Sequence, residues 1–192
     1  MLVMFISLLV TVIYLFIKVI KTQMKTNFND IVYTIFGILY VVGFMLALAL
    51  IYGITGGKYL IWYVLLVAWG TDIMAYAIGR LIGKHKFTKI SPKKSIEGAV
   101  AGIFGGIIFV TLYTLLLNKA FGFNISYWYA ITLGFVLSIF GQLGDLAASS
   151  IKRYTDIKDF GHIIPGHGGI LDRLDSIIFI APVAYILLMF IR

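Results

Sequence analysis

The chain contains no cysteine and few charged residues, and both scarcities limit what it can be. Without cysteine it has no disulfide, no thiol nucleophile and no thiolate metal site. Charged residues make up only 12% of the 192 residues, whereas 61% are hydrophobic and the mean hydropathy is +1.01. An ordinary soluble domain carries roughly 25% charged residues. Because this chain could not cover its apolar surface in water, the composition predicts an integral membrane protein.

Five apolar runs are long enough to cross a hydrocarbon core, which needs about 20 helical residues, and a sixth run starts among charged residues before it becomes apolar. The first run has no basic segment before it and no clear cleavage site, so we interpret it as a retained helix rather than a signal peptide. No linker, repeat or low-complexity tract divides the chain. We therefore expect one all-α polytopic membrane domain over residues 1–192, a bundle of about six transmembrane helices. The runs lie near 2–20, 31–52, 59–83, 96–117, 126–149 and 170–191, the last becoming wholly apolar only after Ser176.

The net charge of +8 is concentrated in three short connections, near 18–29, 80–94 and 152–173. These connections hold thirteen of the sixteen basic residues, and only Lys58, Lys119 and Arg192 lie elsewhere. Because basic loops stay on the cytoplasmic side, we expect all three connections in the cytoplasm and both termini outside. This placement favours membrane orientation and anionic substrates over nucleic-acid binding.

Acidic residues are scarcer still, with eight against sixteen basic residues. Seven of the eight lie in or near the two larger basic connections. The exception, Asp30, follows two asparagines at a helix start, which is typical of a structural cap. Asp72 and Asp145 fall inside apolar runs, where an ionised carboxylate costs roughly 2.5–3.5 kcal/mol. Such residues usually face the bundle interior beside a cation. For Asp72, an ion pair with Arg80 is the structural alternative to a functional role.

The segment from Gly141 to Ser176 has the residues for divalent-metal chemistry. Asp172 and Asp175 are three residues apart, so they share one helix face, and Asp145 on the preceding span can reach the same point. Three hard oxygen ligands suit Mg²⁺. The lack of cysteine and of a paired-histidine motif argues against zinc.

A glycine-rich stretch, 165–169, directly precedes that acidic pair. Glycines allow backbone amides to turn toward an anion, and a helix N-terminus adds a favourable dipole. His167, between two glycines, is a candidate phosphate contact, whereas His162 and His85 are interpreted mainly as ordinary hydrogen-bonding groups. A basic cluster precedes the stretch: Lys152, Arg153 and Lys158.

The other basic connection ends in Ser-Pro-Lys-Lys-Ser-Ile-Glu-Gly, residues 91–98. Ser95 can cap the following helix, and Glu97 lies in its first turn, where negative charge is favoured. Lys93 and Lys94 are either topology determinants or phosphate ligands, and we favour phosphate binding. Along that helix, Gly98, Gly102 and Gly106 recur every four residues, which predicts close packing against another helix.

Together these segments resemble the phosphatidate cytidylyltransferase (CDP-diacylglycerol synthase) family. The family signature is matched by Ser149, Lys152-Arg153, Lys158-Asp159, Pro165-Gly166-His167-Gly168-Gly169 and Asp172-Arg173-Leu174-Asp175. Two further family segments are matched by Asp72 with Ala75-Tyr76 and Gly79-Arg80, and by residues 91–98. The matching part covers about 70–176. Ala148 stands where members often have Glu, Ser95 replaces a Thr, and many members are longer at the N-terminus.

The resemblance implies an enzyme of the cell membrane, with its site facing the cytoplasm, that joins CTP and phosphatidate into CDP-diacylglycerol and pyrophosphate. It implies Mg²⁺, with a monovalent cation such as K⁺ as a further candidate, held by Asp145, Asp172 and Asp175. Lys152 and Arg153 are expected to act with these aspartates in catalysis. A homodimer is compatible with the resemblance. The expected substrate-binding residues are Asp72, Ser91, Lys93, Lys94, Glu97, Lys158, Asp159, His167, Gly168, Gly169 and Arg173.

Three alternatives use similar parts. A CTP-dependent lipid kinase would release CDP rather than pyrophosphate, and a related cytidylyltransferase would accept an isoprenoid ether phosphatidate. A cation transporter is the alternative from another class, because intramembrane aspartates also line ion paths. A transporter does not need a glycine-rich anion site beside a Lys-Arg cluster, which favours the enzyme.

Overall fold

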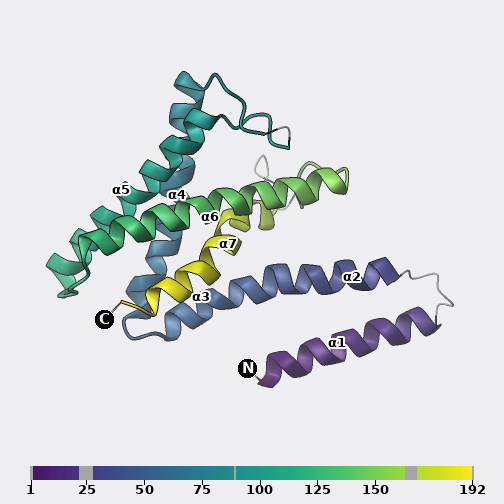
Figure 1. Cartoon of the computed structure of the whole chain (residues 1–192). Helices are drawn as coiled ribbons and strands as arrows, with labels where there is room; N and C mark the ends of the chain where they lie inside the picture. The colour runs from purple at the N-terminus through teal and green to yellow at the C-terminus, as the bar shows by residue number, and fades with distance from the viewer. Residues whose placement is uncertain (1, 22–27, 89, 163–167, 192) are drawn as a thin grey trace. The chain divides into compact units, whose positions relative to one another are not determined.

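The computed structural model describes residues 2–21, 28–88, 90–162 and 168–191, and the regular elements in these ranges are helices (Figure 1). No strand occurs within the ranges, although an isolated antiparallel bridge joins Lys86 and Ser95. The predicted all-α class is therefore confirmed. The elements are α1 (Leu2–Lys21), α2 (Phe28–Gly37), the π-helix η1 (Ile38–Gly43), α3 (Phe44–Gly53), α4 (Gly57–Ile82), α5 (Ile96–Phe121), α6 (Tyr127–Tyr154) and α7 (Leu171–Leu188).

Each of the six predicted runs is helical, and four helical segments are long and apolar enough to cross a membrane. Several helices extend beyond the predicted limits because polar residues at their ends continue the same backbone hydrogen bonding. α7 carries three charged residues near its start, as the sequence of that run indicated. The chain is a multi-pass membrane protein. The four segments are Asn29–Gly53, Gly57–Ile82, Ile96–Phe121 and Tyr127–Tyr154.

The chain divides into two compact units, Met1–Gly43 and Phe44–Arg192. The first unit holds α1, α2 and η1, and within it the rings of Phe36 and Tyr40 stack with centroids 5.7 Å apart. The second unit holds α3 to α7 and every candidate site residue. The single domain expected over residues 1–192 stays a prediction.

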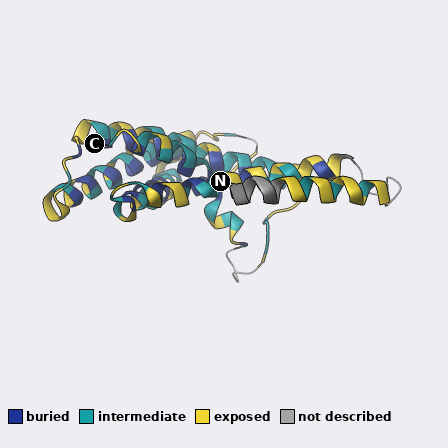
Figure 2. Cartoon of the chain, turned by 90° about the horizontal axis from the view of Figure 1, so that it is seen from below, coloured by how far each residue is buried: buried dark blue, intermediate teal, exposed yellow. Residues whose placement is uncertain are grey.

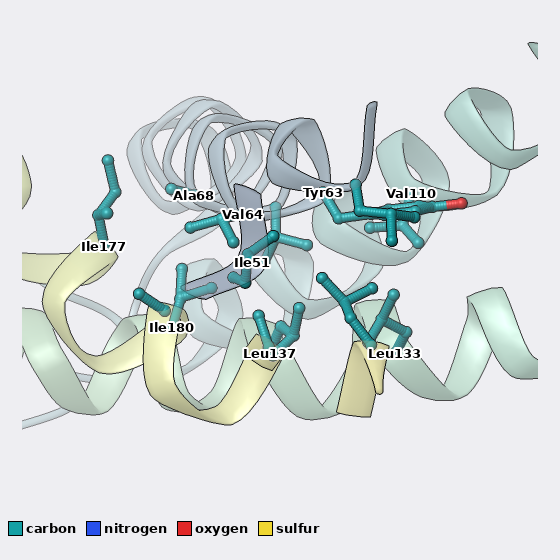
Figure 3. Close-up of a cluster of buried hydrophobic side chains, with 14 of the residues drawn as sticks. Ile51, Tyr63, Val64, Ala68, Val110, Leu133, Leu137, Ile177 and Ile180 are labelled. Atoms are coloured by element: carbon teal, nitrogen blue, oxygen red, sulfur yellow. The ribbon is translucent and has the colours of Figure 1, made fainter. Parts of the chain in front are cut away.

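In the second unit, α5 packs against α4, α6 against α5, and α7 against α6 and α3 (Figure 1). Fully buried apolar side chains from these helices meet in one core, where Figure 3 shows Ile51, Tyr63, Val110 and Leu137 directed toward one another. Many large apolar residues are exposed, and Figure 2 marks the exposed positions along the helices in yellow. Lipid tails are as apolar as these side chains, so the exposure suits a bilayer.

Glycines allow a close contact between α4 and α5. A Cβ added to Gly98 would lie 2.7 Å from the carbonyl oxygen of Ala75, and one added to Gly105 would lie 2.3 Å from that of Gly70. Such distances leave room only for hydrogen, so the predicted packing role of the glycine strip is confirmed. Gly105 was missed because it falls outside the four-residue spacing. The approach of the two helices brings the loop before α5 next to the end of α4.

Candidate active site

The first acidic pair forms where α6 meets α7. A Cβ on Gly144 would lie 2.6 Å from the carbonyl oxygen of Asp175, so the backbones of the two helices nearly touch there. This contact brings the carboxyl of Asp145, the next residue, close enough to that of Asp175 for the two groups to interact directly. Asp175 is buried, and its Oδ1 accepts a hydrogen bond from the backbone N–H of Ser176 at 2.8 Å. The structure therefore joins two of the three aspartates proposed as metal ligands.

Lys94 supplies the cation beside this pair. Its Nζ forms an ion pair and a hydrogen bond with Asp145 Oδ2. The carboxylate of Asp72, on α4, interacts electrostatically with both Asp145 and Lys94. The alternative pairing of Asp72 with Arg80 is not formed, because the Arg80 guanidinium instead donates to the Tyr76 hydroxyl at 3.1 Å. Asp72 thus belongs to the same charged cluster as Asp145.

The loop that carries Lys94 is fastened to the start of α5. Glu97 accepts hydrogen bonds from the backbone N–H of His85 at 3.3 Å, and its Oε1 lies 2.6 Å from His85 Nδ1. The backbone N–H of Phe87 donates to the Lys94 carbonyl, and Ser95 caps α5 by accepting from the Gly98 N–H at 3.1 Å. The predicted cap is confirmed. The histidine contact shows Glu97 holding the loop, whereas its expected role in substrate binding stays a prediction.

A second charged pair joins the end of α6 to the start of α7. Lys152 Nζ donates to Asp172 Oδ1 at 2.8 Å, and the two side chains are only 14% and 8% exposed. The same ammonium lies 5.2 Å from the centre of the Phe160 ring. Asp172 Oδ2 accepts from the backbone N–H groups of Phe160 and Gly169, at 2.8 and 3.0 Å. Asp172 therefore holds Phe160 and Gly169 at the start of α7.

Only part of the predicted glycine-rich anion site is described. Pro165, Gly166 and His167 lie outside the described residues. Gly168 has a φ of +80°, a left-handed conformation that favours glycine, and the N–H of Gly169 is directed at Asp172. The Gly169 N–H, which the sequence analysis assigned to a phosphate, thus already donates to a carboxylate of this chain.

The other candidates lie in the loops and at the helix ends around these two pairs. Lys93, Arg153, Lys158 and Arg173 are exposed, whereas Ser91 and Asp159 are half-buried. The Ser91 carbonyl accepts from the Lys94 N–H at 3.1 Å, which shapes the turn before α5. The expected catalytic role of Arg153 and the expected substrate contacts of the other five residues stay predictions.

The carboxylates fit a divalent cation in chemistry, although Asp172 stands apart. Two acidic groups in contact, with Asp72 nearby, form an oxygen-rich site of excess negative charge, the kind that Mg²⁺ prefers. No group of three His, Asp or Glu side chains in the described ranges is close enough together to hold a metal. Both Asp172 oxygens have partners within the chain. The assignment of Mg²⁺, and of K⁺, to Asp145, Asp172 and Asp175 stays a prediction.

The pairings themselves were not evident from the sequence. Lys94 and Asp145 are 51 residues apart, and Lys152 and Asp172 are 20 apart. Each lysine had several acidic candidates at different separations along the chain, and separation alone does not identify the partner. Only the inter-helix contact at Gly144 and the loop fastened by Glu97 decide the partners.

Comparison with known proteins identifies the family. The profile of the cytidylyltransferase family matches residues 1–191. The chain is 41% identical over 171 residues to a phosphatidate cytidylyltransferase of Staphylococcus haemolyticus (strain JCSC1435), covering 88% of this chain and 63% of the relative. It is 44% identical over 138 residues to one of Bacillus subtilis (strain 168), covering 71% and 48%. The chain thus spans less than two thirds of the length of these curated relatives. It belongs to the cytidylyltransferase family.

Proposed function

We propose that this chain transfers the cytidylyl group of CTP to phosphatidate, giving CDP-diacylglycerol and pyrophosphate. Its family membership and the names of its relatives support this activity. The observation that carries the proposal is the cluster of Lys94, Asp145 and Asp175 beside the buried pair of Lys152 and Asp172. Alternating positive and negative groups at one end of a membrane helix bundle suit two phosphate-bearing substrates.

The reaction needs charge neutralisation more than proton removal. The phosphate of phosphatidate is already an anionic nucleophile at neutral pH. One of its oxygens forms a bond to the α-phosphorus of CTP, while the bond from that phosphorus to the pyrophosphate oxygen breaks. No strong general base is required, so the barrier comes from bringing two polyanions together. Lys94 and Lys152 are the cations held nearest to the acidic cluster.

Asp145 and Asp175, with Asp172, are the residues that would hold a divalent ion. Such an ion, when bound, neutralises charge on the phosphates and polarises them. Lys94 already pairs with Asp145, so its ammonium can exchange a carboxylate for a substrate phosphate without leaving the cluster. Lys152 has no such freedom, because it is held between Asp172 and the Phe160 ring.

We place the site at the cytoplasmic face of the cell membrane. The basic connections support the cytoplasmic orientation of the site. The bacterial source of the relatives supports the assignment to the cell membrane. CTP would arrive from water, and phosphatidate from the adjacent leaflet. The homodimer compatible with the family resemblance remains a proposal.

The direct test uses CTP labelled at different phosphates. The purified chain is incubated with phosphatidate and Mg²⁺, and the lipids are then separated. Cytidylyl transfer places label from the α-phosphate of CTP in the lipid and releases pyrophosphate. Lipid label from the γ-phosphate with release of CDP would instead establish a kinase. Transfer confined to an isoprenoid ether phosphatidate would change the lipid assignment, and ion flux without CTP would favour transport.

A further inference from the structure

An apolar groove runs along the outside of α5 and α6. It holds about 210 Å³ and is lined by one face of α5 between Ile96 and Ile103, one face of α6 between Ile139 and Leu146, and the ring of Phe87. The lining residues follow the helical repeat on both helices, so they form a continuous trough. Its one amide side chain donates to a backbone carbonyl of α5 at 2.9 Å, which leaves the trough almost wholly apolar.

One end of this groove is formed by residues that are sequence neighbours of the charged cluster. Leu146 directly follows Asp145, and Ile96 lies two residues after Lys94. The other end, at Ile103, lies about 10 Å further along α5 at 1.5 Å per residue. One leaflet of a bilayer has a hydrocarbon depth of about 15 Å. The groove therefore runs from the site along much of the thickness of one leaflet.

The groove opens outward, where acyl chains are. Val100 is 50% exposed and Leu143 is 46% exposed, and both belong to helices that can span a membrane. The ammonium of Lys94, two residues before Ile96 in the chain, complements the phosphate of an anionic lipid. An apolar trough with a cation near one end matches one acyl chain and the phosphate headgroup of a single lipid molecule.

We infer that this groove seats one acyl chain of the phosphatidate substrate while the lipid phosphate lies at Lys94. The inference rests on the proposed function, because it assigns the groove to the same substrate. An acyl chain that moves from bulk lipid into the groove gains no hydrophobic free energy. The groove therefore binds it through complementary shape and van der Waals contact. It orients the bound lipid so that the phosphate is presented to the carboxylate cluster.

The first experiment measures binding without turnover. The 192-residue chain in phosphatidylcholine vesicles is exposed to phosphatidate carrying a photoreactive diazirine in one acyl chain, and the cross-linked peptides are sequenced. We expect labelling of 96–103 and 139–146 that unlabelled phosphatidate competes away and extra phosphatidylcholine does not. Labelling that ignores the headgroup would show bulk lipid only, and labelling absent from both segments would likewise overturn the inference.

The second experiment fills the groove. Ile103→Trp narrows its far end, whereas Ile108→Trp places the same side chain on the exposed face of α5 outside it. For long-chain phosphatidate we expect Ile103→Trp to raise KM about tenfold, the scale of one misfitted apolar group in a pocket. For dihexanoyl phosphatidate, whose chains end short of Ile103, KM should stay unchanged. Equal effects of both variants on both lipids would overturn the groove.

The two experiments separate this inference from the proposed function. If no lipid accepts a cytidylyl group but competed labelling of the groove persists, the activity is wrong and the lipid site stands. If transfer occurs but labelling does not depend on the headgroup, the activity stands and the groove is not the phosphatidate site.

Discussion

At the scale of single residues, the three aspartates proposed as metal ligands have different surroundings. Asp145 and Asp175 face each other, and of these two Asp145 is the one that forms an ion pair with a lysine, Lys94. Asp172 is held by Lys152 and two backbone amides. The first two keep negative charge available to a cation, whereas Asp172 fastens a loop.

Asp175→Asn tests the acidic pair. We expect cytidylyl transfer to fall by at least about 100-fold, because the site loses one of the carboxylates proposed to hold the divalent ion. Thermal stability should hold or rise, since the repulsion from Asp145 is relieved. Initial rates and Tm in detergent check both expectations. The matched control is Asp156→Asn, an exposed loop residue with a φ of +53° that Asn tolerates. Near-normal transfer in Asp175→Asn would remove this residue from the site.

Lys152→Met tests the buried ion pair. Leaving Asp172 without its cation should destabilise the chain by about 3–5 kcal/mol, the usual cost of breaking such a pair. The double variant Lys152→Met with Asp172→Asn should recover much of that stability, because no unpaired charge remains. Denaturant or thermal unfolding of the purified chain measures both. Equal stability of the single and double variants would show that the pair contributes little.

At the scale of helices, glycines decide which backbones can touch. α4 and α5 approach at Gly98 and Gly105, and α6 and α7 approach at Gly144. Without hydrophobic attraction between helices in lipid, such close contacts supply much of the packing energy. The Gly144 contact also sets the spacing of Asp145 and Asp175.

Gly144→Ala should therefore lower stability and turnover together. The added Cβ would lie 2.6 Å from a backbone oxygen of α7, and the required helix shift should cost about 1–3 kcal/mol. Gly53→Ala is the control, because a Cβ there meets no atom within 4 Å. Tm and cytidylyl transfer are measured for both variants. A Gly144→Ala chain with unchanged rate would show that the carboxyl spacing is not critical.

At the scale of the whole molecule, the bilayer orients the chain. The ends of α5 should lie on opposite sides of the membrane, since α5 is long and apolar enough to span it. The basic loop before α5 is predicted to lie in the cytoplasm, with its far end outside.

Because the chain has no cysteine, single substitutions can report this orientation. Lys93→Cys and Lys119→Cys place exposed thiols at the two ends of α5. With a membrane-impermeant maleimide, we expect Lys119→Cys to react in intact cells and Lys93→Cys only after permeabilisation. The reverse pattern would place the charged cluster outside the cell and contradict access to cytoplasmic CTP.

The sequence alone determined the membrane class, the six helical runs, the glycine packing of α5 and the cap at Ser95. These features depend on local composition and periodicity, and both are visible in the order of the residues. Only the tertiary structure decided that Lys94 pairs with Asp145 and Lys152 with Asp172. Partner choice depends on which helices approach each other across long separations in the chain, and the spacing of residues in the sequence does not show this. The groove between α5 and α6 likewise exists only once the two helices pack.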